Sequence, residues 1–350
     1  MENSSSISHK NNCFDLLRLL AASMVIFFHQ NMFLGGGFVT DPSDWYPMDS
    51  IWVIMFISLS GFLVTMSFTR SSNFMEFIGK RIKRLFPALI FCNFIVLYLV
   101  APFWQESAFS YIFSSSTFNS FLQMSTLFST GTKVPHLWTD YGWLPAANAP
   151  IWTLAHEFFL YLLAGIAFSF SKTWKAPAIL FVIFMIAQIF FHEQLLPVIF
   201  YSMKMYHFVE LGSNFALGSL MYMTMHTWNN RNSKIAISLI SFIILFMMRQ
   251  EYGAPIICRL AITALTIIIG VSFRDLILKG KFDISYGMYI WAFPVQAICI
   301  NVFHLRFYNG IVIVFTLTIL MAIFSRKYIE QPFMKKKSQA GNLARKIQTE

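Results

Sequence analysis

Charged residues are scarce in this 350-residue chain, at 12% of the composition, whereas hydrophobic residues make up 57% and the mean hydropathy is +0.59. Soluble globular domains carry about 25% charged residues, which keep their surfaces hydrated. With so little charge the chain could not give several soluble domains a polar surface. We therefore exclude a soluble multidomain protein.

Cysteine is also rare, with four residues in the whole chain, Cys13, Cys92, Cys258 and Cys299. Their spacing fits neither a disulfide framework nor a zinc site. We interpret them as small apolar packing residues. The sequence contains no internal repeat and no Walker, EF-hand or zinc-protease motif, and we predict no metal site.

Long apolar runs accompany this lack of charge. A helix needs about 20 apolar residues to cross roughly 30 Å of hydrocarbon. Helices are the natural state for such runs because backbone polar groups cannot stay unpaired in lipid. We therefore predict an all-α, polytopic membrane protein with about ten transmembrane helices. The predicted spans are Phe14–Leu34, Ile51–Phe68, Leu85–Trp104, Ile151–Phe170, Pro177–Phe191, Phe208–Met225, Ile235–Met248, Pro255–Phe273, Ile284–Phe303 and Ile311–Ser325.

The distribution of the basic residues predicts the orientation of these spans. With the N-terminus in the cytoplasm, most lysines and arginines fall on the cytoplasmic side, and the outer side holds Lys133, Lys204, Arg249 and Arg306. Cytoplasmic loops of membrane proteins carry such an excess of positive charge, so both termini are predicted to be cytoplasmic. The same alternation accounts for the net charge of +10 without a nucleic-acid partner.

The domain organisation follows from these spans. We predict a cytoplasmic N-terminal segment at residues 1–13, a transmembrane domain at 14–333 and a basic cytoplasmic tail at 334–350. The segment Phe109–Phe128 is ambiguous, since serine, threonine and asparagine interrupt its apolar residues. A full span there would turn the later basic loops outward, against the charge rule. We therefore predict that Gln105–Pro150 is a long outer loop, which could include a re-entrant or surface helix.

The first predicted span contains three ionisable residues, Asp15, Arg18 and His29. An ionisable group inside a span costs at least ~2.5 kcal/mol, so each needs a reason. Eleven steps of 100° bring Arg18 and His29 to nearly the same face, about 16 Å apart along the axis. Asp15 shares this face and lies close enough to pair with Arg18.

Asp15, Arg18 and His29 thus form a polar stripe along one face of the helix, and two structural explanations compete with a functional one for it. The charged pair could lie at the membrane interface, and His29 could bond to a neighbouring helix. The occurrence of all three residues on one face favours function. A neutral His29 in a polar cleft would accept the proton of a hydroxyl nucleophile.

The fourth predicted span places Glu157 about two turns into a helix, next to His156 and four residues before Tyr161. A buried glutamate must be paired or protonated, and its own helix offers no arginine. We therefore expect Glu157 to face the interior of the helix bundle. A clamp between helices is the structural alternative to a catalytic role.

Basic residues also precede the third predicted span, where Arg81 and Arg84 stand three apart in a loop before Pro87. On their own they satisfy the charge rule for cytoplasmic loops, but guanidinium groups also suit a phosphorylated ligand. The Ser60–Gly61 step in the second span would let a backbone or a ligand approach closely. Small residues there more often serve helix packing.

Several of these segments together resemble the acyltransferase 3 family of integral membrane acyltransferases. The first segment resembles the family's opening helix, with an arginine, ten residues and then a histidine. The resemblance covers about Phe14 to Phe333, and the order of the motifs makes it specific although each motif alone is weak. Many members have a histidine at the position of Ala292, so no catalytic role is assigned there. The motifs are FDLLRLLAASMVIFFH, ISLSGFLVT, RIKRLFP, IWTLAHEFFLY, LGSNFALGSLMY, DISYGMYIWAFPVQ and RKYIEQPF.

The resemblance implies an enzyme, an O-acyltransferase of the inner membrane. It would move an acyl group, most simply acetyl, from cytoplasmic acyl-CoA to a hydroxyl of a surface polysaccharide, such as O-antigen or exopolysaccharide, or of its lipid-linked precursor. Acetyl-CoA would be a substrate, no cofactor would stay bound, and membrane lipids would surround the protein.

The predicted site residues fall into three groups. Predicted to be catalytic are His29, Arg18, Asp15 and Glu157. Predicted to bind the donor are Arg81, Arg84, Ser60 and Gly61. Predicted to bind the acceptor substrate are Trp152, Tyr161 and Tyr289.

Other functions remain open at this stage. A transporter or flippase for a lipid-linked sugar would also need intramembrane charges, but it predicts two related halves with interrupted helices. A glycan polymerase or ligase predicts a large outer loop rich in arginine and histidine, whereas this outer loop holds Lys133 and His136. A structural scaffold would not need charged residues inside the bilayer.

Overall fold

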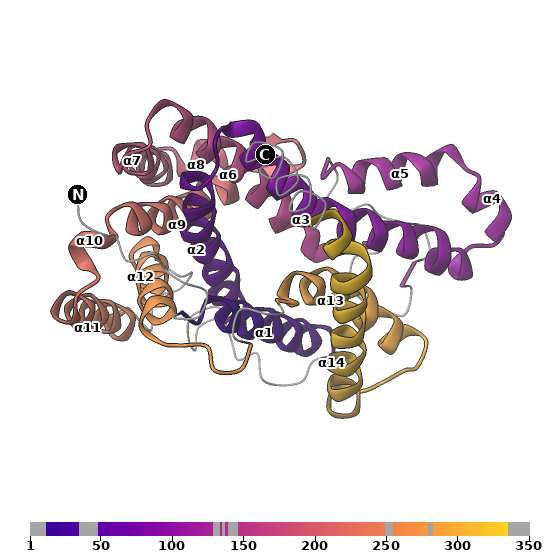
Figure 1. The fold of residues 1–350 in the computed structure, drawn as a ribbon. Coiled ribbons are helices and arrows are strands. Elements are labelled where there is room, and N and C mark those ends of the chain that lie inside the picture. Colours follow the sequence, from indigo (N-terminus) through magenta and orange to yellow (C-terminus); the bar gives the residue numbers. More distant parts are fainter. Residues whose placement is uncertain are drawn as a thin grey trace, which may run out of the picture. The chain divides into compact units, whose positions relative to one another are not determined.

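The computed structural model describes residues 12–34, 48–128, 134, 137–138, 146–248, 255–278 and 283–334. These residues are almost wholly helical, which confirms the all-α prediction apart from one short β-hairpin (Figure 1). The chain divides into two compact units. The first unit comprises Met1–Phe74 and Trp152–Ser285, and the second comprises Met75–Ile151 and Tyr286–Glu350.

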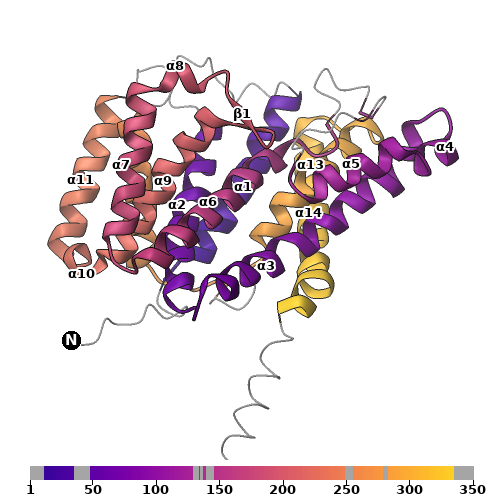
Figure 2. The same cartoon turned by 90° about the horizontal axis from the view of Figure 1, so that it is seen from above.

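The first unit is a helical bundle in which α9 packs against α2, α7 and α12, and α11 packs against α12 (Figure 2). The hairpin joins α8 to α9 through Tyr201 and Ser202, which take positive φ values of 50° and 60°. Positive φ at both turn residues is typical of a tight two-residue hairpin. The elements are α1 (Phe14–Leu34), α2 (Met48–Thr69), α6 (Trp152–Phe170), α7 (Lys175–Phe190), α8 (His192–Leu195), β1 (Ile199–Phe200), β2 (Met203–Lys204), α9 (Met205–Met223), α10 (Met225–Trp228), α11 (Arg231–Met247) and α12 (Ile256–Ser272).

The second unit contains the remaining elements. A Cβ at Gly287 would lie 2.9 Å from Ala322 Cα, so α13 and α14 pack with their backbones close together. The elements are α3 (Phe74–Phe94), the π-helix η1 (Ile95–Val100), the 3₁₀ helix η2 (Ala101–Trp104), α4 (Ala108–Ile112), α5 (Ser115–Ser125), the 3₁₀ helix η3 (Ala149–Ile151), α13 (Ser285–Asn301), α14 (Phe307–Phe324) and the π-helix η4 (Ser325–Glu330).

Each of the ten predicted spans overlaps a helix. Among the described residues, five helical stretches are long and apolar enough to cross a membrane, whereas Lys175–Phe190 and Ile256–Ser272 are apolar but shorter. The chain is therefore a multi-pass membrane protein. The count of ten and the cytoplasmic termini stay predictions. The five stretches are Phe14–Leu34, Ile51–Thr69, Phe74–Trp104, Ala149–Phe170 and Phe307–Met334.

Helices α2, α6, α9 and α12 of the first unit run in the same direction. In each neighbouring pair, a residue near the start of one helix contacts a residue near the start of the other, and a later residue contacts a later one. The predicted topology requires this, since all four correspond to spans that run from the outside to the cytoplasm. The starts of α6, α9 and α12 therefore meet at one end of the unit. The successive contacts are Ser60–Glu157 and Phe68–Phe168, Trp152–His207 and Tyr161–Phe215, and Glu210–Arg259 and Asn214–Thr263.

The basic segment before the third span differs from its prediction as a loop. Helix α3 begins at Phe74, so Arg81 and Arg84 lie on its surface, and it continues through Pro87. Glu76 and Lys80, one turn apart with 3.1 Å between their charged groups, stabilise its first turns. A proline inside a helix removes one hydrogen bond, and membrane helices tolerate this where neighbouring groups bond the freed carbonyl.

The ambiguous segment Phe109–Phe128 forms two short helices, α4 and α5, rather than one span. Each begins with a serine cap: Ser107 accepts from the Ser110 N–H at 3.3 Å, and Ser114 accepts from the Thr117 N–H at 3.1 Å. Serine side chains at such positions bond the first N–H groups of a helix and fix where it starts. At 1.5 Å per residue α5 is only about 16 Å long, too short to cross the membrane.

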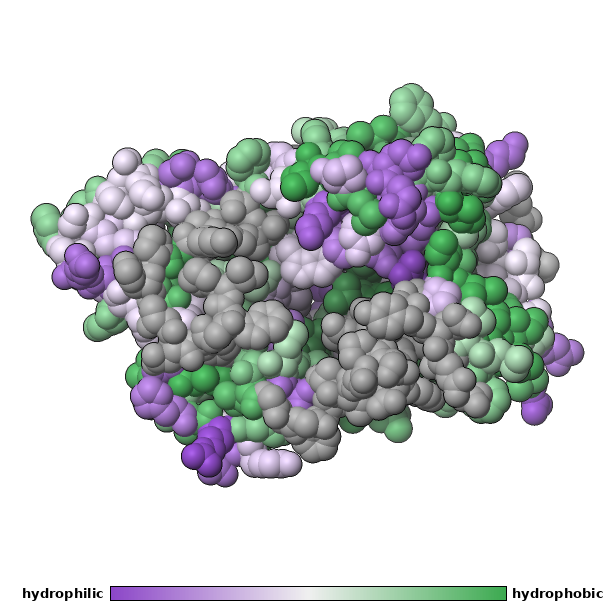
Figure 3. All heavy atoms as spheres, turned by 180° about the vertical axis from the view of Figure 1, so that it is seen from behind, coloured by the Kyte–Doolittle hydropathy of each residue, from purple (hydrophilic) through white to green (hydrophobic). Residues whose placement is uncertain are grey.

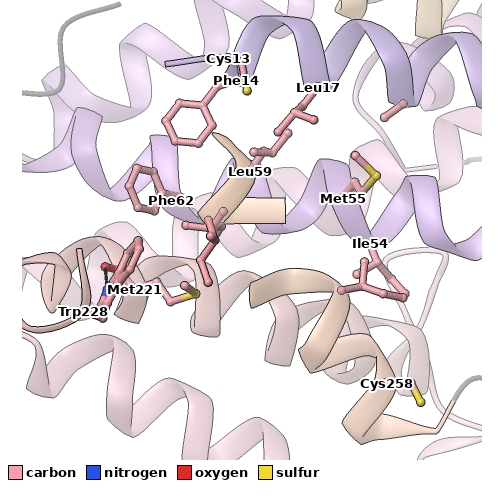
Figure 4. Packing of buried hydrophobic residues seen from close by; sticks show 14 residues of the cluster. Cys13, Phe14, Leu17, Ile54, Met55, Leu59, Phe62, Met221, Trp228 and Cys258 are labelled. Atoms are coloured by element: carbon pink, nitrogen blue, oxygen red, sulfur yellow. Dashed lines mark hydrogen bonds between the residues drawn. The ribbon is translucent and has the colours of Figure 1, made fainter. Parts of the chain in front are cut away.

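The core of the first unit lies between α1, α2, α9 and α12 (Figure 4). The Phe14 and Phe62 rings pack with their centroids 5.1 Å apart, and the Trp228 indole N–H donates to the Met221 carbonyl at 2.9 Å. Burying such side chains in place of polar ones fixes which face of α1 turns inward. This packing therefore sets the direction in which the face of α1 that carries Arg18 and His29 points.

Large apolar side chains also cover the outside of the helices. Figure 3 shows broad hydrophobic areas on the face that it presents, broken by hydrophilic patches. Soluble monomers rarely expose continuous apolar areas of this kind, but lipid tails would cover them. Exposed examples on α7, α11 and α14 are Ile183, Phe242, Ile243, Val312 and Leu320.

Candidate functional site

Arg18 forms an ion pair near the start of α1. Its Nη1 lies 3.1 Å from Asp283 Oδ2, and both side chains are only 13% exposed. The other oxygen, Asp283 Oδ1, accepts hydrogen bonds from the backbone N–H and the hydroxyl of Ser285 at 3.0 and 2.6 Å. Asp15 was predicted to pair with Arg18, whereas Asp283, which lies 265 positions away in the chain, was not predicted as a partner.

His29 lies eleven residues after Arg18 on the same uninterrupted helix, so the stripe predicted from the sequence has the continuous helix that it requires. The two residues are about 16 Å apart along the axis at 1.5 Å per residue. The half-buried His29 ring stacks on Phe33 with the centroids 5.7 Å apart. Gln30 and Asn31 follow and are fully buried, so the end of α1 is polar on its inner side.

Glu157 is the centre of a small hydrogen-bond network between α2 and α6. Its Oε1 accepts hydrogen bonds from the Ser60 and Tyr161 hydroxyls. Both donors are buried, and Tyr161 also lies 3.5 Å from Ser60 Oγ. The expectation that Glu157 turns into the bundle is confirmed. The structure brings together Ser60, Glu157 and Tyr161, to which the sequence assigned three different roles.

Gly61 lies where α2 and α9 touch. A Cβ there would overlap the backbone of Phe215, and the Gly61 carbonyl accepts a hydrogen bond from Ser219 Oγ at 3.1 Å. Gly218 on α9 makes a similar backbone approach to Ser58. The structure thus places Gly61 in helix packing, the alternative left open by the sequence, and its role in donor binding stays a prediction.

A second polar cluster occupies the shared end of α6, α9 and α12. It contains Trp152, predicted to bind substrate, together with His156, His207, Glu210 and Arg259. Glu210 bonds to both His207 and Arg259. Besides Trp152, the sequence signal for this cluster is charge inside the predicted spans, since Arg259 falls in the eighth span and Glu210 in the sixth.

The other predicted residues belong to the second unit. The Arg81 guanidinium lies 6.0 Å from the centroid of the Phe77 ring on α3, and Arg84 is half-buried one turn later. The Tyr289 hydroxyl on α13 donates to the Pro150 carbonyl, and the Asn148 amide donates to the Ile290 carbonyl at 2.9 Å. Tyr289 thus fixes the end of the predicted outer loop to α13.

Within the described ranges, no group of three or more His, Cys, Asp or Glu side chains could hold a metal ion. The four cysteines are free thiols, and each is at most 3% exposed.

Comparisons with known proteins match nearly the whole of the predicted transmembrane domain. The family profile described as an acyltransferase domain matches residues 11–325. An "O-acetyl transferase" of Shigella phage Sf6 is 30% identical over 338 residues, which cover 94% of this chain and 98% of the relative. "Nodulation protein 10" of Rhizobium leguminosarum bv. viciae is 30% identical over 195 residues, 51% of this chain and 50% of the relative. No solved structure matches the chain at a significant level.

The match to the family covers every segment on which the resemblance was based except the closing motif, which begins at Arg326. Nothing in these matches supports the transporter, the polymerase or the scaffold. The prediction that the chain is an acyltransferase is confirmed, and the similarity to the phage protein supports the O-acetyltransferase class. The chain belongs to the acyltransferase 3 family of membrane acyltransferases.

Proposed function

We propose that this acyltransferase moves an acetyl group from cytoplasmic acetyl-CoA to a hydroxyl of a surface polysaccharide or of its lipid-linked precursor. The similarity to an O-acetyl transferase over nearly the whole of both chains supports acetyl as the group and oxygen as the acceptor. The protein would act in the inner membrane with both termini in the cytoplasm. The observation that carries the proposal is the polar stripe of α1, with Arg18 near one end and His29 well inside the predicted span.

The donor would approach from the end of the unit where α1 begins. Coenzyme A is strongly anionic, and guanidinium groups bind phosphate through charge-assisted hydrogen bonds. Arg18, held by Asp283, would stabilise donor phosphate or developing negative charge. Arg81 and Arg84 on α3 carry the same chemistry on the side predicted to be cytoplasmic.

His29 would act as the general base. It takes the proton of the acceptor hydroxyl while that oxygen attacks the carbonyl carbon of the thioester, so that the C–O bond forms as the C–S bond breaks. The proton then passes from His29 to the departing coenzyme A thiolate. In a second route the His29 ring nitrogen attacks the thioester carbon first and expels the coenzyme A thiolate. The hydroxyl oxygen then takes the acetyl group from His29 while its proton passes to the thiolate. Glu157, fixed by Ser60 and Tyr161, would orient His29 or the sugar.

The proposal is tested by comparing the mass of the surface glycan from cells with and without this protein. The glycan should lose an acetyl group without the protein, and reintroduced wild-type protein should restore it. General base catalysis contributes roughly 10²–10⁴-fold, so His29→Ala should lower acetylation at least ~100-fold while the protein still inserts. His226→Ala is the matched control, because His226 is an exposed histidine on α10.

Full acetylation by a well-expressed His29→Ala variant would overturn the proposed role of His29. An assay of the purified protein with acetyl-CoA distinguishes an acyltransferase from a flippase. An acyltransferase should cleave the thioester of acetyl-CoA, whereas a flippase should leave it intact.

A further inference from the structure

The polar cluster at the shared end of α6, α9 and α12 has no role in the acyl-transfer steps described above. Its members are Trp152 and His156 on α6, His207 and Glu210 on α9, and Arg259 on α12. We call these five residues the outer-end cluster, since the charge rule places this end outside. An ion pair alone would serve to clamp two helices, so the histidines and the tryptophan need a further reason.

Glu210 organises the cluster with both of its carboxylate oxygens. Oε1 accepts from Arg259 Nη1, and Oε2 lies 3.2 Å from His207 Nδ1. The exposed fraction of the side chains rises from 13% for Arg259 through 18% for Glu210 to 28% for His207. The guanidinium, the least exposed of the three groups, therefore supports the carboxylate, and the carboxylate supports the more exposed imidazole.

The bond to Glu210 determines which nitrogen of His207 is available. A carboxylate accepts hydrogen bonds, so Nδ1 carries the proton, and in the neutral ring Nε2 then presents a lone pair. A carboxylate that holds an imidazole in one tautomer is the arrangement by which proteins aim a histidine at a hydroxyl group. The orientation of His207 is therefore suited to accepting a hydrogen bond from a ligand hydroxyl.

Trp152 provides an aromatic surface beside this acceptor. Its half-buried ring lies 5.1 Å from His207 and 5.3 Å from His156 between centroids. His156 is itself fixed, since its Nδ1 lies 2.7 Å from the Trp152 carbonyl and its Nε2 3.5 Å from the Lys204 carbonyl of the β-hairpin. Tryptophan and histidine rings thus form a rigid aromatic group at the membrane edge.

An apolar aromatic face next to oriented polar groups matches the two sides of a pyranose. The C–H face of the sugar packs on the ring, and its hydroxyls bond to the polar side chains. Glu210 and Arg259 carry opposite charges that cancel each other. The cluster therefore suits an uncharged sugar better than an acidic one.

We propose that the outer-end cluster binds a neutral pyranose unit of the acceptor glycan, with Trp152 stacking on the sugar and His207 accepting a hydrogen bond from one of its hydroxyls. This inference rests on the proposed function for the identity of the acceptor as a glycan. Glu210 and Arg259 are positioning residues that act through His207. The cluster adds four residues to the three acceptor residues predicted from the sequence, Trp152, Tyr161 and Tyr289.

Binding is measured separately from transfer, on the purified full-length protein. The probe is a set of oligosaccharides released by mild acid from the surface glycan of cells that lack the protein, and binding is measured by isothermal titration calorimetry. Trp152→Ala and His207→Ala should each weaken binding about tenfold or more. They should raise the acceptor KM by the same factor and leave the KM for acetyl-CoA unchanged.

Two conservative variants guard against simple misfolding. Trp152→Phe keeps a ring face, and His207→Gln keeps an acceptor atom, so both should bind the oligosaccharides more tightly than the alanine variants. Trp174→Ala and His226→Ala are matched controls, because both side chains are exposed at the opposite end of the unit. Both controls should bind as the wild type does.

The outcomes separate this inference from the proposed function. If wild-type protein binds the oligosaccharides through Trp152 and His207 but does not cleave acetyl-CoA, sugar binding by the outer-end cluster is supported and acetyl-CoA is excluded as the donor. If the alanine variants bind as tightly as the wild type, or the wild type does not bind, the cluster is not the acceptor site. Cleavage of acetyl-CoA would still support the proposed function in that case.

Discussion

The close approach of α2 to α9 at Gly61 leads to a prediction about Gly61→Ala. An added Cβ would lie 2.9 Å from the carbonyl carbon of Phe215 and 3.0 Å from its Cα, and closer still to its carbonyl oxygen. Ordinary Cβ contacts begin at 3.4 Å, so the two backbones must part by at least half an ångström. The opposing atoms belong to the backbone, and no change of rotamer can relieve the overlap.

The expected loss of stability follows from two opposing effects. Overpacking a tight contact costs about 1–3 kcal/mol, and this case belongs at the upper end because the backbone must move. Replacing glycine by alanine inside a helix returns about 1 kcal/mol. The net destabilisation of Gly61→Ala should be about 2 kcal/mol, which lowers Tm by roughly 5 °C for a unit of this size.

The assay is thermal unfolding of the purified protein in detergent, together with acetyl transfer. Gly79→Ala on α3 is the matched control, because nothing in the described parts of the chain lies within 4 Å of the added atom. Its Tm should stay the same or rise. Ser60 precedes Gly61 and bonds to Glu157, so moving α2 should also lower kcat.

Two results would refute this reasoning. If Gly61→Ala keeps the wild-type Tm, the tight contact between α2 and α9 is wrong. If instead Tm is unchanged while the KM for acetyl-CoA rises, Gly61 belongs to the donor site, as the sequence predicted. A lower Tm with an unchanged KM for acetyl-CoA assigns Gly61 to packing.

Two further predictions concern the basic residues. Arg18→Ala and Asp283→Ala should each destabilise the protein, and the double variant should lose about 2 kcal/mol less than the sum, because a charged hydrogen bond shielded from water is worth this much. Additive losses in thermal unfolding would contradict the pair. Replacing Arg81 and Arg84 together by alanine should raise the KM for acetyl-CoA about tenfold or more, since charged hydrogen bonds to phosphate are lost. Lys175→Ala is the control, and a KM that stays at the wild-type value would exclude both arginines from donor binding.

The helices, and the polar residues that share one face of α1, could be predicted from the sequence because both depend on local patterns. Apolar runs determine helices in lipid, and a fixed turn of 100° per residue places Arg18 and His29 on one face. The i, i+4 spacing likewise places Glu157 and Tyr161 on one side of the helix, where the structure shows a hydrogen bond between them.

The partners that come from distant segments could not be predicted in this way. Asp283 reaches Arg18 across 265 positions, and Arg259 reaches Glu210 across 49. Such pairs depend on which helices are neighbours and on how each helix is rotated about its axis. Neither property produces a repeating pattern within a short stretch of sequence. The basic segment around Arg84 was misjudged as a loop because a proline follows it. Inside a protein, neighbouring groups can compensate for the proline, and the helix continues.

The burial of all four cysteines has a practical consequence for studying this protein. Cys92, Cys258 and Cys299 are fully buried and Cys13 is 3% exposed, so water-soluble thiol reagents should find little to modify on the native chain. A single cysteine introduced at an exposed position, such as Lys172 or Lys204, would then be the main target of a membrane-impermeant reagent. The unmodified sequence should thus give little background labelling in experiments that determine, residue by residue, which side of the membrane each helix end faces.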